Sequence, residues 1–169
     1  MALPDLFKAQ QGTAKSWKST GGDYAITLTS LASAAAREGG KGDLGATWSR
    51  RWAVFFTSSV AVAATNGKEI ELYWAPSTNA TAGTDNPGNV TGVDAALSNP
   101  TELVPQLIFI GSLTLSNARG TNIQKQYFVF YPPTRYGTPV VQNLSGQALG
   151  ATAGDHEIRL TPVDDLVEE

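Results

Sequence analysis

Residues 52–75, WAVFFTSSVAVAATNGKEIELYWA, contain the strongest fold signal in the chain. Large apolar side chains recur at every second position over much of both halves of this stretch, a period of two that is typical of β-strands with one buried face. The Asn-Gly pair at 66–67 separates the halves, and Asn-Gly favours a tight hairpin turn. We therefore predict a β-hairpin whose strands run over 50–64 and 69–75.

The same alternation predicts which side chains of this hairpin face the core. The expected inward side chains are large and apolar, and the positions between them are mostly small, polar or charged, with Phe55 as an apolar exception. The predicted inward set is Trp52, Val54, Phe56, Val60 and Val62 from the first strand and Ile70, Leu72 and Trp74 from the second.

Short strand patterns recur along the rest of the chain, and no helix of ordinary length is expected. The further strands are predicted over 24–29, 107–115, 123–131, 138–144 and 156–163. About seven short strands separated by turn residues indicate an all-β, antiparallel β-sandwich. The long connections over 32–47 and 76–104 favour a jelly-roll-like order rather than a meander.

Two details of these strands lead to further predictions. Gly111 interrupts an apolar run and predicts a β-bulge or a close-packing point. The strand over 123–131 is apolar on both faces, which predicts either a central strand or one covered by another subunit.

The 169 residues fit one folded domain. Residues 1–22 have no regular apolar period and are expected to form an extended N-terminal arm. Residues 23–163 are expected to form the sandwich, and residues 164–169 an acidic C-terminal tail.

Composition excludes several classes of function. The net charge is −3, only 16% of residues are charged, and there is no cysteine. A nucleic-acid-binding protein is expected to carry a basic face, so we expect no nucleic-acid partner. The longest apolar stretch, 52–64, is too short to span a bilayer, and the start of the chain lacks the pattern of a cleaved signal, so we expect neither a membrane partner nor export.

The residues offer little for catalysis. The one histidine, His156, is expected to lie at the surface at the start of a strand, and no serine elbow accompanies it. Glu69 and Glu71 share a strand face, where charged side chains ordinarily contact solvent. We therefore predict no enzyme activity, no catalytic residues and no cofactor. The loop over 84–89 has oxygen ligands that suit a hard cation, but it does not match an EF-hand, so no metal site is predicted.

Two segments are predicted to bind partners. Trp17 lies between Lys15 and Lys18 in the expected arm, where an aromatic side chain has no local core and predicts an anchor on its own sheet or on a neighbour. Asp85 and Asn86 lie in the long polar connection, which is long enough to be a functional loop.

Four phrases of the sequence resemble a recurrent group of small proteins encoded by tailed bacteriophages. They are EIELYWAPS at 69–77, ATAGTDNPG at 80–88, QLIFIGSLTL at 106–115 and PPTRYGTPVVQNLSGQA at 132–148. The resemblance implies a virion structural protein with a jelly-roll-like sandwich, made in the host cytoplasm. It transfers no functional residue.

Within that resemblance we expect a capsid decoration protein on the outer capsid surface. It would bind the major capsid protein and form a homo-oligomer. A neck, tail or fibre-associated structural protein is the first alternative. The second is a carbohydrate- or receptor-binding sandwich that uses Tyr73, Tyr127, Tyr131 and Tyr136, if these line one open groove.

Overall fold

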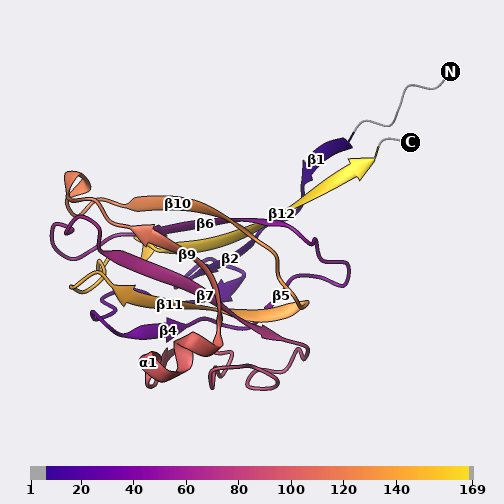
Figure 1. The fold of residues 1–169 in the computed structure, drawn as a ribbon, viewed down its shortest axis with the longest axis horizontal. Coiled ribbons are helices and arrows are strands. Elements are labelled where there is room, and N and C mark those ends of the chain that lie inside the picture. Colours follow the sequence, from indigo (N-terminus) through magenta and orange to yellow (C-terminus); the bar gives the residue numbers. More distant parts are fainter. Residues whose placement is uncertain (1–6, 168–169) are drawn as a thin grey trace.

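The computed structural model describes the backbone of residues 7–167 and the side chains of residues 11–163 (Figure 1). The strands are β1 (Phe7–Gln11), β2 (Lys15–Lys18), β3 (Tyr24–Ala25), β4 (Ala36–Glu38), β5 (Gly42–Asp43), β6 (Trp52–Ser58), β7 (Glu69–Ser77), β8 (Ala95–Leu97), β9 (Ile108–Thr114), β10 (Gln124–Phe130), β11 (Tyr136–Leu144) and β12 (Glu157–Val167). The α-helix α1 (Pro100–Leu103) is one turn long, and 3-10 turns lie at Val104–Gln106, Asn117–Arg119 and Ala153–Asp155.

The strands form two sheets of six that pack face to face. Sheet I has the order β10-β6-β12-β2-β3, with β1 paired to the far end of β12. Sheet II has the order β8-β4-β11-β7-β9, with β5 also paired to β11. All pairs are antiparallel except the short β2–β3 pair. The predicted all-β sandwich is therefore confirmed at the level of two packed antiparallel sheets.

The main core lies between the two sheets and contains three tryptophans. Trp17 and Trp52 come from sheet I and Trp74 from sheet II, and each is at most 1% exposed. Two glycines make room for these rings. A Cβ at Gly42 would overlap the Trp17 ring, and a Cβ at Gly137 would overlap the Trp74 ring. The inward set predicted from the sequence is buried, with one exception: Val62 is 60% exposed.

The predicted hairpin over 50–75 is wrong. β6 pairs with β10 and β12 in sheet I, whereas β7 pairs with β11 and β9 in sheet II. A turn does form at Asn66-Gly67, closed by a hydrogen bond of 3.3 Å from the Lys68 N–H to the Thr65 carbonyl. Gly67 has a positive φ of 75° but Asn66 does not, whereas the hairpin turn that Asn-Gly favours needs a positive φ at both residues. The observed turn sits in a connection between the sheets, because the chain leaves β6 at Ser58 and residues 59–68 cross the sandwich. A local turn signal does not specify which strands then pair.

β9 and β10 are the strands that meet along one side of the sandwich. The register of β7 against β9 shifts between Leu72 and Tyr73, which places a bulge beside Gly111. A Cβ at Gly111 would overlap the Phe128 ring of β10. Both predicted roles of Gly111 are therefore present. The bulge also turns Phe109 outward, to 53% exposure.

β10 is an edge strand of sheet I, so the expectation of a central strand is wrong. Its only strand partner in the described part of the chain is β6. Tyr127 and Val129 are 67% and 61% exposed, because no strand or loop of the described residues covers the outer face of sheet I at this edge.

The long connection between β7 and β9 covers the outer face of sheet II. A second apolar cluster forms there, where Val90, Leu97 and Val104 from the connection pack on Ala75 and Val140 from the sheet. β11 is consequently buried on both faces, with Val141 in the main core and Val140 under the connection. Sheet II is therefore covered on both sides, whereas sheet I is covered on one.

The two ends of the described chain form a ribbon that projects from the sandwich. β1 pairs with the last part of β12 from Phe7 opposite Val167 to Gln11 opposite Val163, and Figure 1 shows this ribbon extending beyond the body. The predicted boundaries at residues 22 and 164 do not coincide with this division. β2 lies inside sheet I, and β12 continues from the sandwich into the ribbon without a break.

Candidate binding surfaces

Trp17 belongs to the core of its own sandwich. Its ring is 0% exposed, stacks on Tyr24 at 5.0 Å between centroids and meets Trp74 edge-on at 5.8 Å. Its Nε1 donates a hydrogen bond of 2.8 Å to the carbonyl of Gly40. Of the two anchoring modes predicted, the structure shows docking on its own sheet, so the assignment of Trp17 as a partner-binding residue is wrong. The sequence did not reveal this role because β2 is short and its pairing partner, β12, lies far away along the chain. The residues near Trp17 in the sequence therefore give no sign of the core that it joins.

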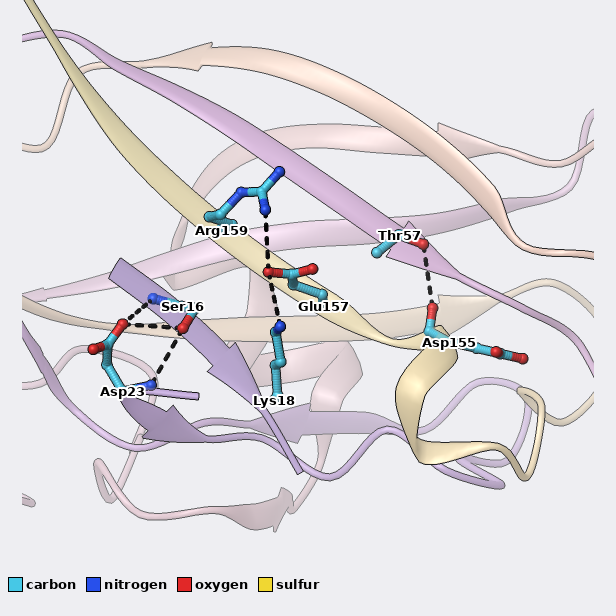
Figure 2. A network of polar contacts seen from close by, with 7 residues as sticks. All are labelled: Ser16, Lys18, Asp23, Thr57, Asp155, Glu157 and Arg159. Carbon is cyan, nitrogen blue, oxygen red and sulfur yellow. Dashed lines mark hydrogen bonds and ion pairs between the residues drawn. The ribbon is translucent and has the colours of Figure 1, made fainter. Parts of the chain in front are cut away.

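Lys15 and Lys18 lie on either side of Trp17 but do not form one basic patch. Lys18 pairs with Glu157 on the outer face of sheet I at 3.3 Å, and Arg159 approaches the same carboxylate at 3.7 Å (Figure 2). Lys15 is half-buried and lines a separate hollow with Trp48. The charge of Lys18 is therefore largely neutralised within the chain.

The β2–β3 turn is fastened by a carboxylate. Asp23 accepts hydrogen bonds from the backbone N–H and the hydroxyl of Ser16, at 2.8 and 3.0 Å (Figure 2). Both hydrogen bonds lower the pKa of Asp23, and the one from the backbone N–H has the larger effect. This contact holds β3 beside β2 and leaves Asp23 unavailable as a free acidic group.

The loop that contains Asp85 and Asn86 is organised around Lys41. The Lys41 ammonium donates to the carbonyls of Thr81 and Thr84 at 2.7 and 2.8 Å. Its other acceptors are the Asn79 carbonyl at 3.1 Å and the Ser77 hydroxyl at 2.9 Å. The oxygens of this loop thus converge on a side-chain cation. Burial lowers the pKa of Lys41, and the Asp85 carboxylate opposes that change.

Asp85 and Asn86 both make contacts within the loop. Asp85 accepts a hydrogen bond from the Thr78 hydroxyl at 2.9 Å, and the Asn86 amide donates to the Val90 carbonyl at 2.8 Å. Asp85 is exposed, whereas the Asn86 Oδ1 atom is buried without a protein partner in the described chain. The two residues lie side by side in a shallow hollow with Pro76 and Thr134.

Two further carboxylates attach the same connection to β4. Glu38, 1% exposed, accepts hydrogen bonds from the backbone N–H groups of Thr91 and Gly92 at 2.7 and 3.0 Å. Burial raises the pKa of Glu38 despite these hydrogen bonds. Asp94 pairs with Arg37 at 2.6 Å and accepts from the backbone N–H of Thr27 at 3.0 Å. The connection predicted to be a free functional loop is thus fastened along its length as a cover for sheet II.

His156 is buried, not at the surface as expected. It is 2% exposed, its Nδ1 lies 2.9 Å from the Ser58 hydroxyl, and its Nε2 lies 2.9 Å from the Gly150 carbonyl. The carbonyl can only accept, so Nε2 carries the proton and Nδ1 accepts from Ser58. Burial lowers the pKa of His156. The Asp155 carboxylate accepts from Ser59 and does not contact the imidazole ring, so the three side chains do not form a triad.

Neither a metal centre nor a membrane-spanning helix is present in the described part of the chain. No group of three or more His, Asp and Glu side chains there is placed to hold a metal ion. None of its helices has the length and apolar character needed to cross a membrane.

Glu71 on β7 is already engaged within the sheet. It accepts a hydrogen bond of 2.6 Å from the Tyr73 hydroxyl. Burial and, to a smaller extent, this hydrogen bond raise the pKa of Tyr73.

The four tyrosines do not line one groove. Tyr127 and Tyr131 belong to the exposed side of sheet I, at 67% and 65% exposure. Tyr73 packs against Phe109 on sheet II at 5.3 Å between centroids, within the second apolar cluster. Tyr136 lies at the start of β11, under the guanidinium of Arg135. The condition that would have favoured a carbohydrate-binding groove is therefore not met.

The open face of sheet I is the main exposed surface that the sequence did not reveal. Phe55 of β6 packs beside Tyr127 at 4.9 Å between centroids, and the Arg159 guanidinium lies 4.9 Å from the Phe55 ring. Val129 of β10 and Tyr131, the residue directly after the end of the strand, continue this exposed row. A shallow hollow forms where Phe55, Tyr127 and Arg159 approach Gln11 at the base of the terminal ribbon. The apolar side chains on both faces of 123–131 are the available sequence signal, from which the sequence predicts a central strand or one covered by another subunit.

Comparison with known proteins adds no relative to this picture. No protein-family model matches the chain, and no curated protein matches it.

Proposed function

We propose that this chain is a structural component of a tailed-bacteriophage virion, with a jelly-roll-like sandwich. Its preferred role is capsid decoration, in which it binds the major capsid protein on the outer surface and stabilises the shell. The four phrases that resemble small tailed-phage proteins supply the link to a virion. The exchange of consecutive strands between sheets, as from β9 to β10 to β11 to β12, supports the jelly-roll-like order.

The projecting ribbon of β1 and β12 is the observation that carries the proposal of a protein partner. Beyond Val163 the ribbon has two strands, and no third strand pairs with either in the described chain. An isolated two-stranded ribbon is only marginally stable in water, and both its edges present unpaired backbone groups. Pairing with a strand of another protein supplies the missing hydrogen bonds, as in β-strand addition.

Deleting residues 1–12 tests this role while sparing the sandwich. The cut removes β1 and keeps β2 with Trp17, whereas a cut through residue 20 would remove part of the core. We expect the truncated chain to keep a cooperative thermal transition but to lose attachment to capsid shells of the phage that encodes it. Co-sedimentation with purified shells measures attachment, and Lys68→Met on the distant turn at 65–68 is the control, since Lys68 is exposed.

Two outcomes would overturn the proposal. One is unchanged attachment of the truncated chain, which would remove the role of the ribbon. The other is failure of the full chain to attach to shells at all, which would remove the decoration role. Imaging the labelled protein on intact particles separates the outer capsid from the neck, tail and fibres.

A further inference from the structure

The row of exposed side chains on β10 belongs to an edge that nothing in the fold covers. Sheet II has its outer face under the connection between β7 and β9, but sheet I has no such layer. Tyr127, Val129 and Tyr131 occupy successive outward positions on this edge, each more than 60% exposed. Phe55 widens the row toward the middle of the sheet.

β10 has few of the features that ordinarily protect an edge strand from pairing. Its register with β6 is regular over seven residues, from Gln124 opposite Ser58 to Phe130 opposite Trp52. It contains no proline, and its one charged residue is Lys125. Short length, bulges, prolines and charged side chains, lysine above all, are the usual protections, and Lys125 is the one of them that β10 carries. A regular edge strand of seven residues whose second half, Tyr127–Phe130, is apolar favours pairing with another strand.

We infer that β10 pairs antiparallel with β10 of a second copy of this chain, across a two-fold axis at Phe128. This register places Tyr127 opposite Val129 of the second copy. It also places Lys125 opposite Tyr131 of the second copy. Each contact occurs twice, because a two-fold axis relates the two copies and the same surface of each copy forms the interface.

The charge and shape of the strand favour a second copy as the occupant. The one charged residue of the strand faces an aromatic ring, so no like charges oppose each other and each Lys125 gains a cation–π contact. The side-chain period of two keeps outward residues opposite outward residues, which joins the two exposed rows into one band. Pro132 and Pro133 follow the paired segment directly and end it at the same place in both copies.

The half-buried Phe128 lies on the inner face of sheet I, opposite the exposed row, and would also be covered in this dimer. Its ring already packs over Gly111 of β9, and the second copy would bring its own Phe128 alongside it. The inferred dimer therefore buries apolar side chains on both faces of the joined sheet. It does not depend on the proposed virion role, since association in solution requires no capsid.

Sedimentation velocity of the full chain across a range of concentrations tests the inference. We expect a monomer–dimer equilibrium that Val129→Lys weakens by about tenfold or more, because each substitution places two new charges in the interface. Val62→Lys is the matched control, since Val62 is 60% exposed and lies outside sheet I. A full chain that stays monomeric at every concentration overturns the inference, as does equal weakening by both substitutions.

A crosslink tests the register. The chain has no cysteine, so the double variant Tyr127→Cys, Val129→Cys carries the only thiols. In the inferred register each new thiol lies opposite a thiol of the other copy, within reach of a disulfide. We expect a covalent dimer on mild oxidation, whereas Val62→Cys should give none. Absence of the crosslink in a chain that does dimerise overturns the two-fold axis at Phe128.

Discussion

Replacing Lys41 by methionine should loosen the cover of sheet II. Methionine keeps an unbranched side chain of similar length but removes the ammonium, so the carbonyls of Thr81 and Thr84 lose their donor. An ammonium has three N–H donors, and hydrogen bonds to charged groups contribute about 1.5–3 kcal/mol each. Water reaches the Thr81 carbonyl at the surface and replaces part of this contribution. We therefore expect Lys41→Met to lower the free energy of unfolding by about 2–4 kcal/mol.

This loss corresponds to a fall in Tm of about 4–16 °C for a domain of this size. Differential scanning calorimetry measures it, and limited proteolysis shows whether residues 77–92 become accessible first. Lys68→Met is the matched control, because Lys68 is exposed and is expected to shift Tm little. In Lys41→Ala, ammonium chloride should recover part of the loss and sodium chloride less, since ammonium supplies the same donors. A Tm of Lys41→Met equal to that of Lys68→Met would refute the idea that Lys41 organises the loop.

Two further predictions concern buried side chains of the core. Trp17→Ala should lower the free energy of unfolding by about 3–5 kcal/mol, as expected for a buried aromatic residue, and urea denaturation should show a much smaller loss for the half-buried Trp48→Ala. Burial lowers the pKa of His156 in the folded chain below its ordinary value of 6.5. As pH falls, the imidazole of the unfolded chain therefore takes up a proton before that of the folded chain does. The free energy of unfolding should decrease as pH falls below about 6.5. Comparing the pH dependence of Tm with that of His156→Asn isolates this contribution, and equal pH dependence of the two proteins would contradict it.

Predictions about which face a side chain takes were largely right, while predictions about strand pairing failed. Alternation is a local property, so Ile70, Leu72 and Trp74 were placed correctly in the core. The hairpin over 50–75 was wrong because a turn fixes only the path of the chain over a few residues. Whether the following strand returns to the same sheet depends on contacts with β10 and β11, far away in the sequence.

The assignment of Trp17 as a partner-binding residue, and the picture of a free loop around Asp85, failed for a related reason. Trp17 looked like an anchor because its neighbours in the sequence are polar, but its packing partners Tyr24 and Trp74 come from other strands. Asp85 looked like part of a free loop because nothing local indicates that Lys41, more than forty residues earlier, draws the loop carbonyls together. In both cases the deciding contacts are long-range.

The sequence by itself determined that the chain is an all-β sandwich, because a side-chain period of two and frequent turn residues are local signals. It also marked Gly111 as a bulge and close-packing point. Only the tertiary structure decided which strands are edges, which connection becomes a cover and where the two ends of the chain meet. These depend on burial between distant segments, and they leave sheet II covered on both faces while the outer face of sheet I and the ribbon of β1 and β12 stay open.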